Sequence, residues 1–181
     1  MARLKKTVAL VGLMGAGKTS VGQIVARRLR APFLDSDREI EEAAAMTVAE
    51  IFARDGEPFF RAREAEVLTR LMEGPPAVLS TGGGAYLSAE NRATIAARGV
   101  AVWLRADLEL LWSRVRHKST RPLLMTGDPK DTLARLHRER TPAYAQAQIV
   151  VDGAPHLSLD QMASRVIEAL DDAAEGVLDD P

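Results

Sequence analysis

A glycine-rich octapeptide that directly follows an apolar run constrains the fold more than any other stretch. Residues 7–11 read Thr-Val-Ala-Leu-Val, and residues 12–19 read Gly-Leu-Met-Gly-Ala-Gly-Lys-Thr, the pattern G-x-x-x-x-G-K-[ST]. Short runs rich in β-branched residues are typical of buried strands. After the octapeptide, apolar residues recur with helical spacing at Val21, Ile24, Val25 and Leu29. We therefore expect a strand, a phosphate-binding loop and a helix in immediate succession.

This pattern also predicts which residues hold a nucleotide. Glycines have no Cβ, so the loop can turn its amides toward phosphate oxygens, and the helix N-terminus adds partial positive charge. In such a loop, Lys18 reaches the β- and γ-phosphates and Thr19 binds Mg²⁺. A glycine-rich turn with a chance lysine would not explain the strand before it and the helix after it. The predicted ATP-binding residues of the loop are Gly15, Ala16, Gly17, Lys18, Thr19 and Ser20.

Composition is compatible with one cytoplasmic domain. The chain has 181 residues, 46% of them hydrophobic, which suffices for a core without metals or disulfides. It contains no cysteine, which excludes a disulfide framework or a thiolate zinc site and fits a reducing cytosol. No apolar run approaches the length of a membrane span, and no signal peptide or membrane anchor is visible. We expect a single domain over residues 1–172 and no membrane partner.

Charge is unevenly distributed along the chain. The net charge is −1, but the last eleven residues hold no base and five acids, Asp171, Asp172, Glu175, Asp179 and Asp180. The remainder therefore has a small excess of basic residues, which suits small anionic substrates but lacks the density that nucleic-acid binding requires. We expect residues 173–181 to form an acidic, disordered tail and the protein to bind no nucleic acid.

Strand-like and helix-like patterns alternate through the rest of the sequence. Further short apolar runs occupy residues 33–34, 77–80, 100–104 and 149–151. Helix-start signals lie between them, including a capping box from Thr47 to Glu50 and N-cap residues at Asp107 and Asp128. This alternation predicts an α/β fold with three layers, α/β/α, around a five-stranded parallel sheet.

Polar residues follow two of the predicted strands, where parallel sheets bind ligands. Asp35-Ser36-Asp37 ends the second strand, and one of its acids is expected to serve the metal or the acceptor, although either could only cap the next helix. Ser80-Thr81 stands where many phosphate-loop NTPases carry an aspartate, which leaves Asp35 as the best metal-supporting carboxylate. Three glycines, residues 82–84, follow and let a ligand approach bare backbone.

Basic residues form two further candidates for anion binding. Arg61 follows two phenylalanines at the start of a predicted helix, although such an arginine is often only a solvated surface charge. Residues 114–122 form a cationic segment of low apolar content, which predicts either a solvated surface loop or a loop that closes over a phosphoryl group. The three histidines have no spacing typical of metal ligands.

From about residue 5 to residue 170 the chain resembles the shikimate kinase family, a small branch of the nucleoside-monophosphate-kinase-like P-loop kinases. Six segments carry the resemblance in order: residues 12–20, Leu34-Asp-Ser-Asp37, Phe60-Arg61, Gly82-Gly-Gly84, Thr120-Arg-Pro-Leu-Leu124 and Arg140-Thr-Pro-Ala-Tyr144. The loop alone would indicate only an NTPase class. The resemblance implies a P-loop kinase fold with a substrate-binding region at about 36–64 and a mobile lid at about 115–128.

The resemblance also implies the acceptor-binding residues. Asp37 matches the aspartate that holds the reacting hydroxyl, and Arg61 and Arg140 match the pair that binds the shikimate carboxylate. Gly83, between Gly82 and Gly84, matches a backbone donor to the same ligand. Guanidinium groups suit this task because they bind carboxylates bidentately.

The remaining implied roles concern ATP and Mg²⁺. Arg121 matches a lid arginine that reaches the phosphates and, with Lys18 and Asp37, completes the predicted catalytic set. Asp35 matches an acid that holds Mg²⁺ through water, and Arg114 falls where the family has an adenine-contacting arginine. The loop Asp152-Gly-Ala-Pro-His156 departs from the family pattern, so we expect main-chain contacts to adenine there, with Pro155 included.

The expected reaction is transfer of the γ-phosphoryl group of ATP to the 3-hydroxyl of shikimate, with Mg²⁺, by a monomer in aromatic amino-acid biosynthesis. Related kinases for gluconate or a nucleoside monophosphate are the nearest alternatives. A non-catalytic ATP-binding module is another, and it would tolerate loss of Asp37. A GTPase is disfavoured because no [NT]-K-x-D motif occurs in the sequence.

Overall fold

A computed structural model of the chain describes residues 2–118, 127–173 and 176–179. In these ranges five strands form one parallel sheet in the order β2-β3-β1-β4-β5. The strands are β1 (Thr7–Val11), β2 (Phe33–Asp35), β3 (Val78–Ser80), β4 (Gly99–Arg105) and β5 (Ile149–Asp152). The predicted fold class is therefore confirmed.

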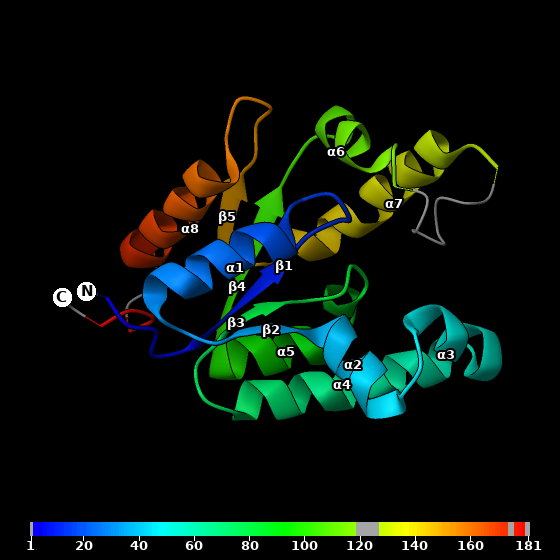
Figure 1. Cartoon of the computed structure of the whole chain (residues 1–181), viewed down its shortest axis with the longest axis horizontal. Helices are drawn as coiled ribbons and strands as arrows, with labels where there is room; N and C mark the ends of the chain where they lie inside the picture. The colour runs from blue at the N-terminus through cyan, green and yellow to red at the C-terminus, as the bar shows by residue number, and fades with distance from the viewer. Residues whose placement is uncertain (1, 119–126, 174–175, 180–181) are drawn as a thin grey trace.

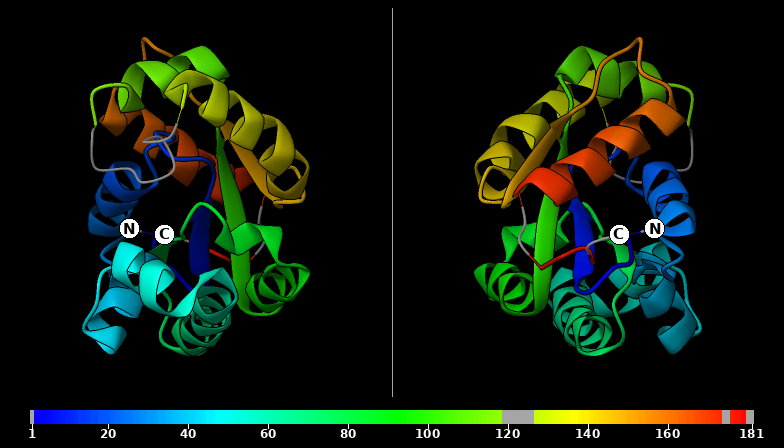
Figure 2. Two further views of the ribbon diagram at one scale, coloured as in Figure 1. Left: turned by 90° about the vertical axis from the view of Figure 1, so that its right-hand side faces the viewer. Right: turned by 90° about the vertical axis from the view of Figure 1, so that its left-hand side faces the viewer.

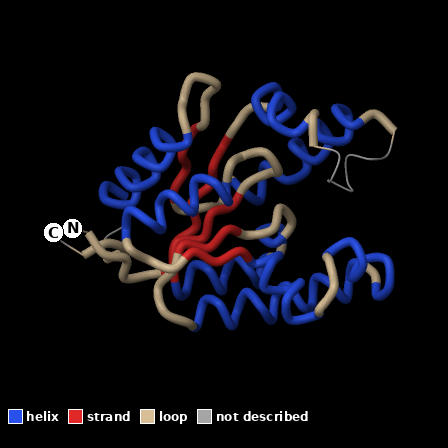
Figure 3. Tube along the Cα trace, viewed as in Figure 1, coloured by secondary structure: helices blue, strands red, loops and turns tan. Residues whose placement is uncertain are grey.

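Helices cover both faces of the sheet, which gives three layers (Figures 1 and 3). Helices α1 (Lys18–Leu29) and α8 (Leu159–Ala173) pack together on one face, and α4 (Glu57–Glu73) and α5 (Ala89–Arg98) lie on the other. The remaining helical elements are α2 (Ser36–Ala44), α3 (Val48–Asp55), the 3₁₀ turn η1 (Ala85–Leu87), α6 (Leu108–Val115) and α7 (Pro129–Tyr144).

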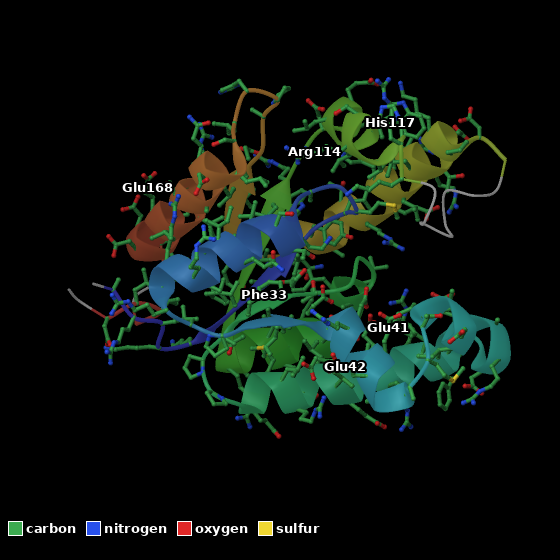
Figure 4. The ribbon with its side chains drawn as sticks, viewed as in Figure 1. Phe33, Glu41, Glu42, Arg114, His117 and Glu168 are labelled. Carbon is green, nitrogen blue, oxygen red and sulfur yellow. The ribbon has the colours of Figure 1, made fainter. Side chains whose placement is uncertain are left out.

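The core is centred on β1, which pairs with β3 on one side and β4 on the other. Every residue of β1 is buried, because helices cover both faces of a strand in this position. This explains why its sequence reads as a continuous apolar run and not as an alternating one. On one face, α1 approaches β2 so closely that a Cβ at Gly22 would lie 2.8 Å from the ring of Phe33 (Figure 4).

Local capping chemistry starts several helices where the sequence predicts. The Thr47 hydroxyl accepts from the Glu50 amide at 3.1 Å, and the Glu50 carboxylate accepts from the Thr47 amide at 2.9 Å. The carboxylates of Asp107 and Asp128 cap α6 and α7 by accepting from amides of the first turn. These side chains satisfy amides that would otherwise lack partners in the first helical turn.

The strand order places a topological switch point between the neighbouring strands β1 and β3, because the chain leaves β1 toward β2 on one side and leaves β3 toward β4 on the other. Ligands bind at such points, outside the carboxyl ends of the strands. Viewed toward this edge, α6 and α7 lie on one side of the strands and α2 and α3 on the other (Figure 2, left). The switch point therefore lies between two groups of helices, α6 with α7 and α2 with α3.

The carboxyl-terminal segment corrects one expectation. Residues 176–179 do not form a disordered acidic end: the Lys5 amide donates to the Val177 carbonyl, and the Asp179 amide donates to the Arg3 carbonyl, each at 2.8 Å. Val177 is only 2% exposed, and Lys5 pairs with Asp179 at 2.7 Å. An apolar pair, Val177 and Leu178, lies between the acids and supplies the burial that a purely charged tail would lack. Residue 173 belongs to α8, and the rest of the predicted tail lies outside the described residues.

Both described ends of the chain lie together, on the side away from the carboxyl edge of the sheet (Figure 1). None of the helices in the described part of the chain has the length and apolar content that a membrane-crossing helix needs.

Candidate active site

The loop between β1 and α1 has the backbone shape that its glycines predict. Gly12, Gly15 and Gly17 have φ angles of 146°, 84° and 94°, in a region that side chains with a Cβ rarely adopt. Gly17 is the N-cap of α1 and provides no side-chain cap, so the first amides of that helix remain available to an anion. Space also restricts position 15, where a Cβ would lie 2.8 Å from Val115 on α6.

Two cations lie on this loop. The Lys18 ammonium donates to the carbonyls of Gly12 at 2.6 Å and Leu13 at 3.2 Å. Arg114 extends from α6 and donates to the Gly15 carbonyl at 3.0 Å (Figure 4). Burial lowers the pKa of the Arg114 guanidinium from its usual value. The two side chains thus concentrate positive charge where phosphates are expected.

Oxygen ligands meet at the start of α1. The Thr19 hydroxyl lies 3.5 Å from Asp35 Oδ2 and 3.5 Å from the Ser80 hydroxyl. The other oxygen of Asp35 caps α2 by accepting from the amides of Asp37 at 3.0 Å and Arg38 at 3.2 Å. Asp35 therefore serves as a helix cap and also faces Thr19, so the two interpretations of this acid are compatible. Hydroxyl and carboxylate oxygens fit Mg²⁺, which prefers oxygen ligands and usually retains several waters.

Three consecutive glycines, Gly82, Gly83 and Gly84, collect the predicted acceptor residues from three different helices. We call them the glycine triplet. A Cβ at Gly82 would lie 2.5 Å from the Asp37 carboxylate of α2, and one at Gly83 would lie 2.9 Å from the Arg140 guanidinium of α7. A Cβ at Gly84 would overlap the Arg61 guanidinium of α4. One carboxylate and two guanidiniums thus lie in contact with adjacent residues of bare backbone.

A buried acid that the sequence reasoning missed lies beside these arginines. Glu64 is 1% exposed, and its Oε1 accepts from Arg61 at 2.8 Å. Among the described residues, its Oε2 has no hydrogen-bond partner. Burial raises the pKa of Glu64, although the nearby Arg61 and Arg140 act in the opposite direction. Its spacing of three residues from Arg61 on one helix was the available signal.

Tyr144 is a second residue to which the sequence reasoning assigned no role. Its hydroxyl donates to the Gly83 carbonyl at 2.5 Å, and its ring packs against Trp103 with centroids 6.0 Å apart. Burial raises the pKa of the phenol, while Arg140 and Arg61 partly offset that rise. The phenol is therefore a neutral donor that holds the middle of the glycine triplet against α7.

Asp37 has a pKa raised from 3.8 to about 6, first because the carboxyl is buried and then because Asp35 and Glu64 lie near. Lys18 acts in the opposite direction. A carboxylate with a pKa close to neutrality can accept a proton more readily than an ordinary aspartate and still be ionised at pH 7. Because Asp37 lies beside Gly82, this proton acceptor is close to the two arginines that lie beside Gly83 and Gly84.

The predicted adenine side is only partly assembled by the structure. Gly153 packs toward Leu110 of α6, with 3.6 Å from an added Cβ to the leucine side chain, and Pro155 is exposed on the same loop. Asp152 forms a bidentate ion pair with Arg105 at 2.5 and 2.9 Å, so the arginine offsets the negative charge of this acid. Arg121 lies outside the described residues, as does most of the predicted lid.

Comparison with known sequences identifies relatives over nearly the whole chain. A family model described as Shikimate kinase matches residues 14–171. The shikimate kinase of Cereibacter sphaeroides is 61% identical over 170 residues, which cover 94% of this chain and 85% of that protein. The shikimate kinase of Ruegeria pomeroyi is 59% identical over 169 residues, or 93% and 87% of the two chains.

Comparison with solved structures agrees. A shikimate kinase from Acinetobacter baumannii in complex with shikimate superposes with a TM-score of 0.88 at 36% identity, covering 94% of this chain and 95% of that one. A gluconokinase from Sinorhizobium meliloti reaches a TM-score of 0.61 at 18% identity, which shows a shared fold alone. The resemblance predicted from six short segments is thus confirmed by whole-chain similarity, and the chain belongs to the shikimate kinase family.

Proposed function

We propose that this member of the shikimate kinase family transfers the γ-phosphoryl group of ATP to the 3-hydroxyl of shikimate through the residues assembled at the switch point. The observation that carries the assignment is the convergence of Asp37, Arg61 and Arg140 on the glycine triplet. This set provides two planar cations for a carboxylate and one proton acceptor for a hydroxyl. It lies beside β1 and the phosphate-binding loop, so acceptor and nucleotide share one edge of the sheet.

In this proposal the acceptor is held at two points. Arg61 and Arg140 bind the shikimate carboxylate with charge-assisted hydrogen bonds, which are stronger than neutral ones. Asp37 accepts a hydrogen bond from the 3-hydroxyl, orients its oxygen toward the γ-phosphorus and takes up the proton as the new bond forms. Glu64 holds Arg61 by an ion pair at 2.8 Å, which keeps the guanidinium directed at the glycine triplet.

The nucleotide side supplies charge stabilisation. Lys18 now donates to loop carbonyls and is proposed to donate instead to the β- and γ-phosphates when ATP is bound. Mg²⁺, held by Thr19 and through water by Asp35, would supply neutralisation of the phosphate charge. Arg121 is proposed to add a further cation from the lid. Adenine is proposed to contact Arg114 and the main chain near Pro155.

The direct test is phosphoryl transfer to a panel of acceptors by the purified protein with ATP and Mg²⁺. Shikimate, gluconate and AMP are compared, with ADP release measured and the product identified by mass spectrometry and ³¹P NMR. We expect shikimate 3-phosphate with shikimate, and little transfer to gluconate or AMP. Preferred transfer to gluconate or AMP would contradict the proposal. ATP binding without transfer to any acceptor would favour the non-catalytic module.

Cellular location and oligomeric state belong to the same proposal. We place the enzyme in the cytoplasm as a monomer, since the cysteine-free sequence fits a reducing compartment and the site draws all its described residues from one chain. Size-exclusion chromatography with light scattering tests the monomer, and a dimer whose dissociation abolishes turnover would contradict it.

A further inference from the structure

The 3₁₀ turn η1, which directly follows the glycine triplet, is held by two side chains of α5. The Asn91 side-chain amide donates to the Ala85 carbonyl at 2.9 Å. Arg92 donates through one nitrogen to the carbonyls of Tyr86 at 2.8 Å and Leu87 at 2.9 Å. Every carbonyl of this three-residue turn therefore has a partner on α5.

The η1 turn also forms hydrogen bonds with the glycine triplet. The Ala85 amide donates to the Gly82 carbonyl at 3.1 Å, and the Leu87 amide donates to the Gly84 carbonyl at 3.2 Å. A continuous path of hydrogen bonds thus runs from Asn91 and Arg92 through η1 to the first and last glycines of the triplet.

Both α5 side chains are themselves fixed. Asn91 is 3% exposed, and its backbone amide donates to the Ser88 hydroxyl at 3.2 Å, which caps α5. The Arg92 guanidinium lies over the Tyr86 ring at 6.0 Å from the centroid. A buried side-chain amide without a hydrogen-bond partner costs free energy. The Asn91 amide therefore favours the one position of η1 in which the Ala85 carbonyl can accept from it.

The glycine triplet needs such support because it lacks side chains that could pack it. Its main chain is also bonded from other directions: the Gly82 amide donates to the Ser36 hydroxyl at 3.1 Å, and the Gly83 carbonyl accepts from Tyr144. Within the described part of the chain, the amides of Gly83 and Gly84 have no acceptor. They are therefore the donors that this turn can offer to a bound anion.

We propose that Asn91 and Arg92 are positioning residues for the acceptor site. They hold η1, and through it the glycine triplet, where its free amides and the groups of Asp37, Arg61 and Arg140 meet. This inference rests on the proposed function, because it assigns α5 to the binding of the anionic acceptor. Neither side chain touches the acceptor, and the nucleotide side is not expected to depend on them.

The test separates the kinetic constants for the two substrates. Asn91→Asp keeps the size of the side chain but places a carboxylate, which cannot donate, against the Ala85 carbonyl. We expect the KM for shikimate to rise about 5–20-fold, while the KM for ATP stays within about twofold. For Arg92→Met, which removes both hydrogen bonds to η1 but keeps an apolar stem over Tyr86, we expect a rise of roughly 3–10-fold, partly restored in Arg92→Lys.

Two control variants on α5 distinguish positioning from stability. Ile95→Val alters a fully buried side chain one turn after Asn91 and lowers the melting temperature without removing a side-chain hydrogen bond to η1. Arg98→Met removes an exposed arginine that pairs with Glu73 at 3.6 Å at the far end of the helix. We expect an unchanged KM for shikimate in both. If Ile95→Val at equal loss of melting temperature raises that KM as much as Asn91→Asp, the positioning role is refuted.

Amide hydrogen exchange provides a readout that does not depend on turnover. In ligand-free protein, Arg92→Met is expected to raise exchange within residues 82–88 and to leave residues 12–20 unchanged. Faster exchange in the turn supports positioning even if the wild-type protein phosphorylates a different acceptor, in which case the proposed function fails and the positioning role survives. Unchanged exchange together with unchanged KM for shikimate would overturn the inference.

Discussion

The nucleotide side and the acceptor side of the site are built in different ways. The phosphate-binding loop is one uninterrupted stretch, residues 12–19, and its shape follows from positive φ angles at its glycines. The acceptor side is assembled from α2, α4, α7 and the glycine triplet, which are far apart in the sequence. The first depends on local backbone conformation, and the second depends on how separate helices pack.

This difference predicts different responses to substitution. Changes on the acceptor side are expected to alter binding of shikimate or the proton transfer and to leave ATP binding nearly intact. The two sides meet at Asp35, whose one oxygen caps the helix of Asp37 while the other faces Thr19. The predictions below test whether the two sides are separable, beginning with the largest expected effect.

The largest effect is expected from Asp37→Asn. The amide keeps the shape of the side chain but cannot take the proton of the acceptor hydroxyl. Turnover is therefore expected to fall by about 10²–10⁴-fold, the usual contribution of a positioned base. Binding of ATP, measured by isothermal titration calorimetry, is expected to change less than about twofold. Turnover close to that of the wild type would show that another group accepts the proton.

Arg61→Lys is expected to have the next largest effect. Lysine keeps the charge but cannot form the bidentate contact of a guanidinium, and one charge-assisted hydrogen bond is worth about 1.5–3 kcal/mol. The KM for shikimate is expected to rise by about 10–100-fold. Arg63→Lys on the same helix is the matched control, since Arg63 is exposed, forms an ion pair with Glu66 at 3.0 Å and lies over the Phe59 ring at 5.2 Å from its centroid. A selective loss of ATP binding in Arg61→Lys would contradict the division into two sides.

A methyl group added at Gly83 tests the contact between the glycine triplet and α7. The new Cβ would lie 2.9 Å from the Arg140 guanidinium, which must shift away from the acceptor. A displacement of this kind is expected to raise the KM for shikimate by roughly tenfold. Gly74→Ala is the control, because its nearest contact would be an ordinary 3.4 Å and its φ of −75° suits alanine. Equal effects of the two substitutions would indicate general destabilisation.

The difference between local and assembled structure also explains which parts of the site could be predicted from the sequence. The octapeptide predicted its strand, loop and helix because each depends on neighbouring residues, and the capping box from Thr47 to Glu50 was predictable for the same reason. Local sequence made Arg61 a candidate for anion binding, but Arg140 and its pairing with Arg61 were found only through resemblance to a family, since nothing local brings α4 to α7. Glu64 and the role of Tyr144 were missed, because a polar residue in a helical pattern does not reveal whether the tertiary packing will bury it.

The pH dependence of the acceptor side follows from Asp37. In the free enzyme its pKa is about 6, so the ionised form is lost as the pH falls through that value. The kcat/KM for shikimate is expected to be level above pH 7 and to fall about tenfold per pH unit well below pH 6. ATP binding at the same pH values is the internal control. A level profile down to pH 5 would contradict an essential ionised Asp37.

The same raised pKa has a consequence for stability. Because the folded protein holds the Asp37 proton more tightly than the unfolded chain, with a pKa of about 6 against 3.8, the carboxyl favours folding at low pH. That contribution is lost as the pH rises from about 4 through 6. Asp37→Asn removes the buried charge. The melting temperature of this variant is therefore expected to be a few degrees above that of the wild type at pH 8, and the difference is expected to disappear near pH 4.

The smallest effect on activity is expected at the opposite end of the sheet, where residues 176–179 pair with residues 3–5. Truncation after residue 175 exposes the cavity that Val177 fills, and it is expected to lower the melting temperature by roughly 5 °C without changing either KM. Asp179→Asn, which removes only the exposed ion pair with Lys5, is expected to shift it by less than about 2 °C. If the truncation instead raised the KM for shikimate, the chain ends would be coupled to the acceptor side through the sheet, and local packing would no longer suffice to explain that side.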